Sequence, residues 1–268
     1  MTKKNLSTPI KNVLISQPAP NEGEKSPYKE LAEKFGFQPH FRKFIKVEGV
    51  PAKEIRKERI QFLDYSAVIL TSKNAADHYF RLAKEMRIEV PVGMKYLCAS
   101  ESTAFYIQNY VQYRKRKIFF PKNQTLQAML DLIHKHRNEN FLFPTSNVGK
   151  TDLPKALEAE KAKYKVTKVK FYRTVPDDVS DLKMSKYNML VFFSPIEIKS
   201  LLDNFPKFKQ GKTVIAAFGS GTAEAVEKAG LKLQISAPTP QFPSMTAAID
   251  AYLTALAKAT ARAKSSTK

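Results

Sequence analysis

The chain has 268 residues, of which 43% are hydrophobic, so it can bury one large core or two of ordinary size. No apolar run approaches the about 18 residues of a membrane span, the N-terminus does not resemble a signal peptide, and the single cysteine, Cys98, excludes an internal disulfide framework, so we expect a cytoplasmic protein. The 45 Lys and Arg residues against 25 Asp and Glu residues give a net charge of +20, which predicts attraction to polyanions.

Nine short apolar runs are expected to form strands, because polar or turn-forming residues bound each of them. Helical patterns follow most of these runs. Strands that alternate with helices indicate parallel sheets of the α/β class. The runs cover residues 13–16, 67–70, 95–99, 117–120, 141–143, 166–172, 189–193, 213–218 and 233–236.

Capping residues mark the ends of several expected helices. Ser26-Pro27 places a cap and a first-turn proline at the start of one helix, and Gly36 ends it. Ser194-Pro195-Ile196-Glu197 has the serine and glutamate spacing of a capping box. Thr222 opens another helix, and Gly230 closes it.

Basic residues gather in two places. One is the block Arg114-Lys115-Arg116-Lys117, and the other follows the last helix, which is expected from Met245 to about Lys258. Residues 259–268 are expected to form a flexible basic tail. Solvated surface explains both clusters better than a specific site does.

The segment FLFPTSNVGKTDL (141–153) places Gly149-Lys150-Thr151 between a strand and a helix, close to the layout of a nucleotide-binding P-loop. That motif needs a glycine five positions before Gly149, where this chain has Pro144. Proline has no amide hydrogen to offer a phosphate, so the nucleotide interpretation is disfavoured. A strand that feeds a helix N-terminus still favours anions, and Ser146 and Asn147 are placed to meet a carboxylate.

The chain contains a faint internal repeat. Residues 67–80 resemble 189–205, and residues 96–107 resemble 215–226. Each pair shares an apolar strand, a loop with small residues and a helix. Two similar α/β halves are the simplest explanation, and two lobes would form a cleft lined by helix N-termini.

Two extended segments interrupted by proline, 41–54 and 169–181, could cross between the lobes. In that arrangement residues 1–45 and 174–268 form one lobe and residues 46–173 form the other. The periodicity fits a simple split near residue 140 as well.

Metal and nucleophile chemistry have little support in the sequence. His134 and His136 are two positions apart on an expected helix and point in different directions. There is no Cys/His cluster with zinc spacing and no G-x-S-x-G motif. Cys98 ends an apolar strand, where a buried and inert thiol is typical.

Four hydroxyl residues lie where a strand meets a helix: Ser72, Thr103, Ser194 and Thr222. Any one of them is explained as an N-cap that stabilises its helix by about 1 kcal/mol. Four at similar positions in two halves favour a set of carboxylate-binding sites. The run Gly219-Ser220-Gly221 would let a ligand approach the backbone closely.

Tyr172 is the candidate proton donor. It ends an expected strand at the junction of the lobes, beside Arg173. A phenol is protonated at neutral pH and could act as a general acid. A purely structural role, as a half-buried strand tyrosine, is equally consistent with its position.

Several segments together resemble the uroporphyrinogen-III synthase family. Residues 141–176 are similar to its strand, loop, L-x-x-x-L and Tyr-x-Thr-x-Pro succession. VFFSPIEIKSLL (191–202) resembles its F-x-S-P segment, and AAFGSGTAEAVEKAGL (216–231) resembles its A-x-G-x-x-T-A segment. VILTSKNAADHYF (68–80) and ASESTA (99–104) resemble the corresponding N-terminal pieces. The similarity extends over about residues 12–255.

The resemblance implies two Rossmann-like α/β lobes joined by a two-stranded β-ladder, which selects the division at residues 46–173. It implies a lyase that dehydrates and cyclises hydroxymethylbilane, with inversion of ring D, to uroporphyrinogen III in haem biosynthesis. It implies no cofactor, a monomer, an octacarboxylate substrate, and hydroxymethylbilane synthase as the upstream partner.

The resemblance also assigns roles to residues. Tyr172 matches the position favoured as the general acid for departure of the hydroxyl group. Thr103 and Thr222 match threonines in the family's cleft, and Ser72 and Ser194 match serines near its ligand.

Two other classes of function remain open. A homologue could bind tetrapyrroles or other polyanions on the same scaffold without turnover. A nucleic-acid binder is supported by the charge of +20 but by no recognised motif, so it is disfavoured.

Overall fold

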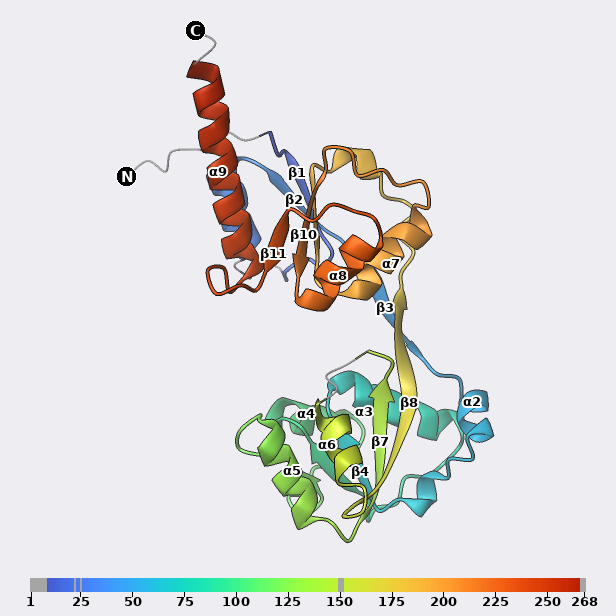
Figure 1. Ribbon diagram of the computed structural model, residues 1–268. Helices are drawn as coiled ribbons and strands as arrows, with labels where there is room; N and C mark the ends of the chain where they lie inside the picture. Colours follow the sequence, from blue (N-terminus) through green and yellow to red (C-terminus); the bar gives the residue numbers. More distant parts are fainter. Residues whose placement is uncertain (1–8, 22, 25, 149–151, 266–268) are drawn as a thin grey trace. The chain divides into compact units, whose positions relative to one another are not determined.

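The computed structural model describes residues 9–21, 23–24, 26–148 and 152–265, with side chains to residue 260. The chain divides into two compact units (Figure 1). Lobe 1 comprises residues 1–46 and 175–268, and lobe 2 comprises residues 47–174. The P-loop-like residues 149–151 lie outside the described part of the chain.

Lobe 1 is built on a five-stranded parallel sheet. Its strands, in spatial order, are β11 (Ile235–Ala237), β10 (Val214–Phe218), β9 (Met189–Phe192), β1 (Asn12–Ile15) and β2 (Gln38–Phe41). Successive residues of a strand face opposite sides of the sheet, so Val13 and Ile15 join one apolar core while Leu14 joins the other. Continuous burial on both faces explains why the central strands β9 and β10 are apolar throughout.

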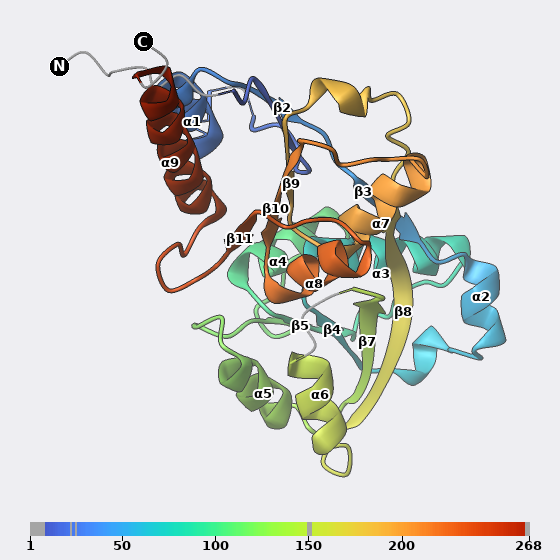
Figure 2. The same cartoon turned by 45° about the horizontal axis from the view of Figure 1, so that its top comes forward.

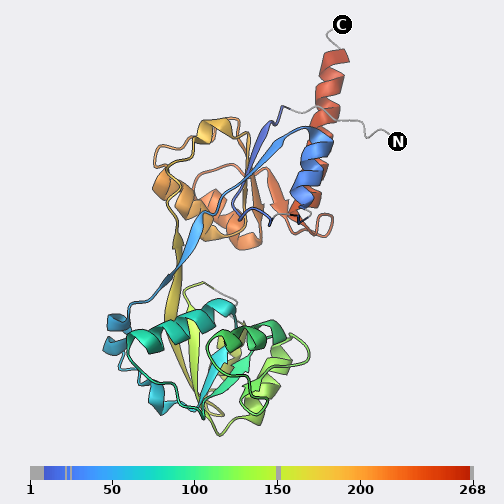
Figure 3. The same ribbon diagram turned by 180° about the vertical axis from the view of Figure 1, so that it is seen from behind.

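Helices cover both faces of this sheet. The helices α1 (Pro27–Phe35) and α9 (Met245–Ser265) pack side by side on one face (Figure 3). Lys34 of α1 pairs with Asp250 of α9 at 2.6 Å. The other face carries α7 (Pro195–Asn204), α8 (Ser220–Lys228) and the short 3-10 turn η3 (Met184–Lys186).

Lobe 2 contains a six-stranded sheet. Its order is β3 (Ile45–Gly49), β8 (Lys165–Pro176), β7 (Asn140–Ser146), β4 (Ala67–Leu70), β5 (Lys95–Cys98) and β6 (Ile118–Phe119). The four pairs from β8 to β6 are parallel. The two sheets therefore confirm the predicted α/β class with parallel sheets.

The helices of lobe 2 also lie on two faces. One core includes residues of α2 (Ala52–Lys57), α3 (Lys73–Glu85) and α4 (Glu101–Tyr106), with the turns η1 (Phe62–Asp64) and η2 (Ile107–Asn109). The other lies under α5 (Leu126–Lys135) and α6 (Asp152–Ala159), which are neighbours (Figure 2).

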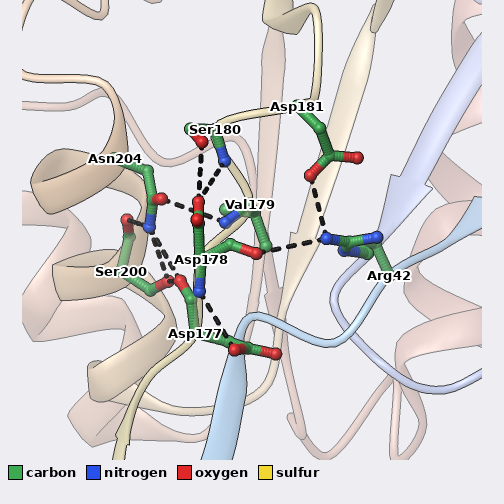
Figure 4. A network of polar contacts seen from close by, with 8 residues as sticks. All are labelled: Arg42, Asp177, Asp178, Val179, Ser180, Asp181, Ser200 and Asn204. Carbon is green, nitrogen blue, oxygen red and sulfur yellow. Dashed lines mark hydrogen bonds and ion pairs between the residues drawn. The ribbon is translucent and has the colours of Figure 1, made fainter.

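Where β8 enters lobe 1, side chains fix the chain on both sides (Figure 4). Asn204 of α7 donates to the Asp177 carbonyl at 2.9 Å and accepts from the Val179 amide at 3.0 Å. Arg42 donates to the Asp178 carbonyl at 3.1 Å and pairs with Asp181 at 2.8 Å. The segment that follows β8 is therefore held to α7 and to the chain just after β2.

All nine predicted strands form, but some boundaries differ. β7 continues through Pro144 to Ser146. A proline is tolerated at this position because β4 pairs with β7 only as far as Leu142, so that beyond Leu142 β7 has one strand neighbour. β2 and β3 were not among the nine runs, since their residues are only partly buried and mixed in polarity.

Two helix boundaries also differ from expectation. α9 continues to Ser265, so residues 259–265 are helical rather than part of a flexible tail. The segment is rich in alanine, lysine and arginine, which favour helix, and no glycine or proline interrupts it. α8 begins at Ser220 with Gly219 as its N-cap, two residues before the predicted start at Thr222.

Candidate functional site

In each lobe, the parallel strands deliver polar residues to the carboxyl edge of the sheet. In lobe 2, Ser72 and Ser100 follow β4 and β5, and Ser146 at the end of β7 pairs in register with Tyr172 of β8. In lobe 1, Ser194 follows β9 and Gly219 follows β10. Ligand sites of open α/β sheets form at this edge.

Tyr172 lies against the first turn of α3. Its side chain is buried, and its hydroxyl is 3.3 Å from the Ser72 hydroxyl. Ser72 is the N-cap of α3 and accepts from the Ala75 amide at 3.1 Å. The cap thus has two tasks, because the same oxygen satisfies a helix amide and contacts the phenol.

His78 of α3 covers the Tyr172 ring. The two ring centroids are 5.1 Å apart and the planes differ by 13°, which is an offset stack. Arg81 donates from Nε to His78 Nδ1 at 3.1 Å. Burial is the main reason that the pKa of His78 is lowered, and the Arg81 charge lowers it further while Asp77 and Glu85 act in the opposite direction.

Thr103 lies in the first turn of α4, but it does not cap that helix. Ser100 is the N-cap and accepts from the Thr103 amide at 3.2 Å. The Thr103 hydroxyl is 3.0 Å from the Ser100 hydroxyl, and the Thr103 residue is 4% exposed. A pair of hydroxyls therefore lies at the start of α4.

Ser146 and Asn147 are engaged by the backbone. Asn147 accepts from the Thr174 amide at 2.7 Å and donates to the Thr174 carbonyl at 3.0 Å. Ser146 donates to Asn147 at 3.1 Å and accepts from the Val148 amide at 3.2 Å. Asn147 thus ties the loop after β7 to β8, so its amide is used for structure.

In lobe 1, Ser194 precedes α7, and a buried carboxylate lies beside it. Glu197 accepts from the Phe193 and Ser194 amides at 2.6 and 3.1 Å and from the Ser16 hydroxyl at 2.6 Å. Burial raises the pKa of Glu197, and these three donors oppose the rise. Ser194 is the N-cap of α7 and forms the predicted capping box with Glu197, while its buried hydroxyl makes no hydrogen bond of ordinary geometry within the described residues.

The run from Gly219 to Thr222 forms the start of α8. Gly219 has φ 89° and ψ 145°, and its amide donates to the Ala237 carbonyl at 2.6 Å. Ser220 and Gly221 are exposed, whereas Thr222 is buried. Gly221 lies beside Pro195, the residue after Ser194, so the N-termini of α7 and α8 are adjacent.

The described residues include no group of three or more His, Cys, Asp or Glu side chains that could hold a metal ion. Burial raises the pKa of the Cys98 thiol to about 12, so that thiol is protonated at neutral pH. Among the same residues, no helix is long and apolar enough to cross a membrane.

The sequence patterns did not identify Ser16, His78 or Ser100 as residues of these edges, nor did they predict the contact between Ser16 and Glu197. Ser100 was detectable, because it precedes Thr103 at the spacing of an N-cap and its amide. The contacts of His78 with Tyr172 and of Ser16 with Glu197 join distant parts of the chain, and no local sequence pattern predicts them.

Comparison with known proteins finds one family model and several solved structures that match this chain. A family model described as uroporphyrinogen-III synthase HemD matches residues 26–247. The solved structure of uroporphyrinogen-III synthetase from Helicobacter pylori is 16% identical with a TM-score of 0.53, covering 92% of this chain and 100% of that one. A mutant uroporphyrinogen III synthase from the extremely thermophilic bacterium Thermus thermophilus is 18% identical with a TM-score of 0.46, covering 92% and 99%. No curated protein matches the chain. The similarity to the H. pylori structure shows a shared fold.

Proposed function

The chain belongs to the uroporphyrinogen-III synthase family, an enzyme family of tetrapyrrole biosynthesis, and we propose that it is a cyclising hydro-lyase acting on hydroxymethylbilane. The terminal hydroxyl takes up a proton and leaves as water, and the resulting cation is attacked by the substituted α-carbon of ring D. The bond from that carbon to the methylene bridge of ring C then breaks, and the free α-carbon of ring D bonds to the same methylene and loses its proton, which closes the macrocycle with ring D inverted. The reaction is redox-neutral and its atoms balance without a cofactor.

The observation that carries the proposal is the placement of Tyr172 at the carboxyl edge of the lobe 2 sheet. Its hydroxyl lies 3.3 Å from Ser72 at the N-terminus of α3. We assign Tyr172 as the general acid that protonates the departing hydroxyl, because a phenol carries a proton to give at neutral pH. Ser72 holds the phenolic oxygen and is the nearest hydroxyl from which the proton could be replaced.

The substrate's carboxylates would meet hydroxyls and helix N-termini. We assign this role to Ser72, Thr103, Ser146, Ser194, Gly219, Ser220, Gly221 and Thr222. The first amides of α3, α4 and α8 lack partners within their own helices and favour anions. The buried Ser194 hydroxyl faces the Glu197 amide in the capping box and donates to no group among the described residues, so its hydrogen is available to a carboxylate. Asn147 is better explained as a structural residue, since both polar atoms of its amide bind Thr174.

In this mechanism, catalysis depends mainly on how the protein orients the substrate. Hydroxymethylbilane is reactive and closes without help, so the protein must orient the substrate such that the substituted carbon of ring D meets the cation.

We further propose that the protein works as a cytoplasmic monomer and that hydroxymethylbilane synthase supplies its substrate.

The test of the function is product identity. The protein is incubated with freshly made hydroxymethylbilane, and the oxidised uroporphyrin isomers are separated. We expect type III. Type I alone, the spontaneous product, would contradict the synthase assignment. Substrate binding without any shift in isomer would indicate a tetrapyrrole-binding homologue instead.

The test of the acid role is Tyr172→Phe, which keeps the ring and removes the hydroxyl. We expect type III formation to slow by about 10²-fold or more, the usual contribution of a general acid. Tyr79→Phe is the matched control, because it removes a buried hydroxyl from α3 in the same core. Near-normal activity of Tyr172→Phe would remove Tyr172 from this role.

A further inference from the structure

We infer that His78 is a positioning residue for Tyr172. Its neutral imidazole holds the phenol ring in a stack, with the hydroxyl at Ser72, and Arg81 holds the imidazole in that state. The inference rests on the proposed role of Tyr172 as general acid.

The stack fixes the ring plane of Tyr172. The tyrosine comes from β8 and the histidine from the second turn of α3, and the planes are within 13° of parallel. The Ser72 hydroxyl then fixes the far end of the phenol at 3.3 Å. Together the two contacts define the plane of the ring and the position of its oxygen, both of which a directed proton transfer needs.

Arg81 determines the state of the imidazole. Its Nε donates to His78 Nδ1, so Nδ1 carries a lone pair and the neutral ring has its proton on Nε2. The guanidinium is itself anchored, since it donates to the Val50 carbonyl at 2.9 Å and the Phe171 carbonyl at 3.4 Å. Phe171 directly precedes Tyr172, so Arg81 ties the histidine to the strand that carries the acid.

Burial, with the Arg81 charge, keeps His78 neutral at physiological pH. On α3 the charged neighbours are Arg81, Asp77 and Glu85, and from β8 the histidine faces the uncharged Tyr172. Burial and Arg81 lower the pKa of His78 and outweigh the two carboxylates. Protonation at low pH would turn Nδ1 into a donor facing the Arg81 donor, which would break the anchor.

A pH profile separates positioning from simple packing. In the wild type, type III formation is expected to fall at acidic pH as His78 becomes protonated. His78→Phe keeps an aromatic ring that neither titrates nor accepts from Arg81, so we expect the acidic fall to be lost and the activity at neutral pH to drop toward the level that the wild type shows at acidic pH. His134→Phe is the control, because His134 also contacts a tyrosine of lobe 2, Tyr164, and its loss should leave the profile unchanged.

A double-mutant cycle tests whether His78 acts through Tyr172. We expect His78→Ala to reduce kcat for type III by about tenfold in the wild type and to add little in the Tyr172→Phe background. Equal losses in both backgrounds, or an acidic fall that persists in His78→Phe, would overturn the inference. An inactive wild type would instead refute the proposed function, so the two failures are distinguishable.

Discussion

At the scale of single residues, Glu197 is the most unusual charged group in lobe 1. Its residue is 3% exposed, and no positively charged side chain is among the partners that shift its pKa. Two amides and the Ser16 hydroxyl are its donors. Such donors stabilise the carboxylate, but the raised pKa means that desolvation outweighs them.

The raised pKa predicts how stability depends on pH. Below the unfolded-state pKa, the carboxyl is protonated in both states and contributes nothing. Between that pKa and the raised folded-state pKa, the folded state binds more protons than the unfolded state, so stability falls as pH rises. We expect Glu197→Gln to remove this part of the slope, so its advantage over the wild type should grow as pH rises from about 4 toward neutral.

Urea unfolding of both proteins across that pH range checks this expectation. Glu224→Gln, on the exposed surface of α8, is the control and should run parallel to the wild type. A Glu197→Gln curve parallel to the wild type would show that the buried carboxylate does not titrate as expected.

At the scale of elements, the start of α8 depends on one backbone conformation. Gly219 has a positive φ of 89° with an extended ψ of 145°, a region that residues with a Cβ rarely adopt. This conformation turns the chain from β10 into α8 and lets the Gly219 amide reach the Ala237 carbonyl. Gly221, two residues on, lies inside the helix and has no such requirement.

We therefore expect the two glycines to respond differently to alanine. Gly219→Ala should lower the free energy of unfolding by about 1–3 kcal/mol through backbone strain. Gly221→Ala should be neutral or stabilising by up to about 1 kcal/mol, because its Cβ would lie 3.7 Å from Pro195, an ordinary contact. Urea unfolding of both variants measures the difference, and equal effects would refute the strain.

Much of this element structure was predictable, because the determinants are local. The run AVIL at 67–70 is fully buried and forms β4, and Ser72 caps the next helix as its position suggests. The site was less predictable. His78 meets Tyr172 only through the packing of α3 on β8, and Ser16 meets Glu197 across 181 residues of sequence. Periodicity identifies faces and ends of elements but not which distant side chains meet.

At the scale of the whole molecule, the net charge of +20 is not explained by any single motif or binding site in the chain. Some of the basic side chains that the structure describes are paired on the surface, such as Lys168 with Glu158 and Lys199 with Asp203. Exposed pairs of this kind contribute little to stability. Because the excess of positive charge remains after pairing, we interpret it as a long-range field that attracts a polyanionic substrate.

If the net charge of the protein attracts the substrate, salt should weaken substrate binding but leave the rate of the chemical step unchanged. Raising the ionic strength from about 0.01 M to about 0.15 M shortens the screening length from about 30 Å to about 8 Å. We expect kcat/KM for type III formation to fall several-fold over this range while kcat holds, since bound substrate is already inside the screening length. Thermal unfolding at each salt concentration controls for lost protein. A KM that does not change with salt would mean that local groups alone capture the substrate and that the net charge serves another purpose.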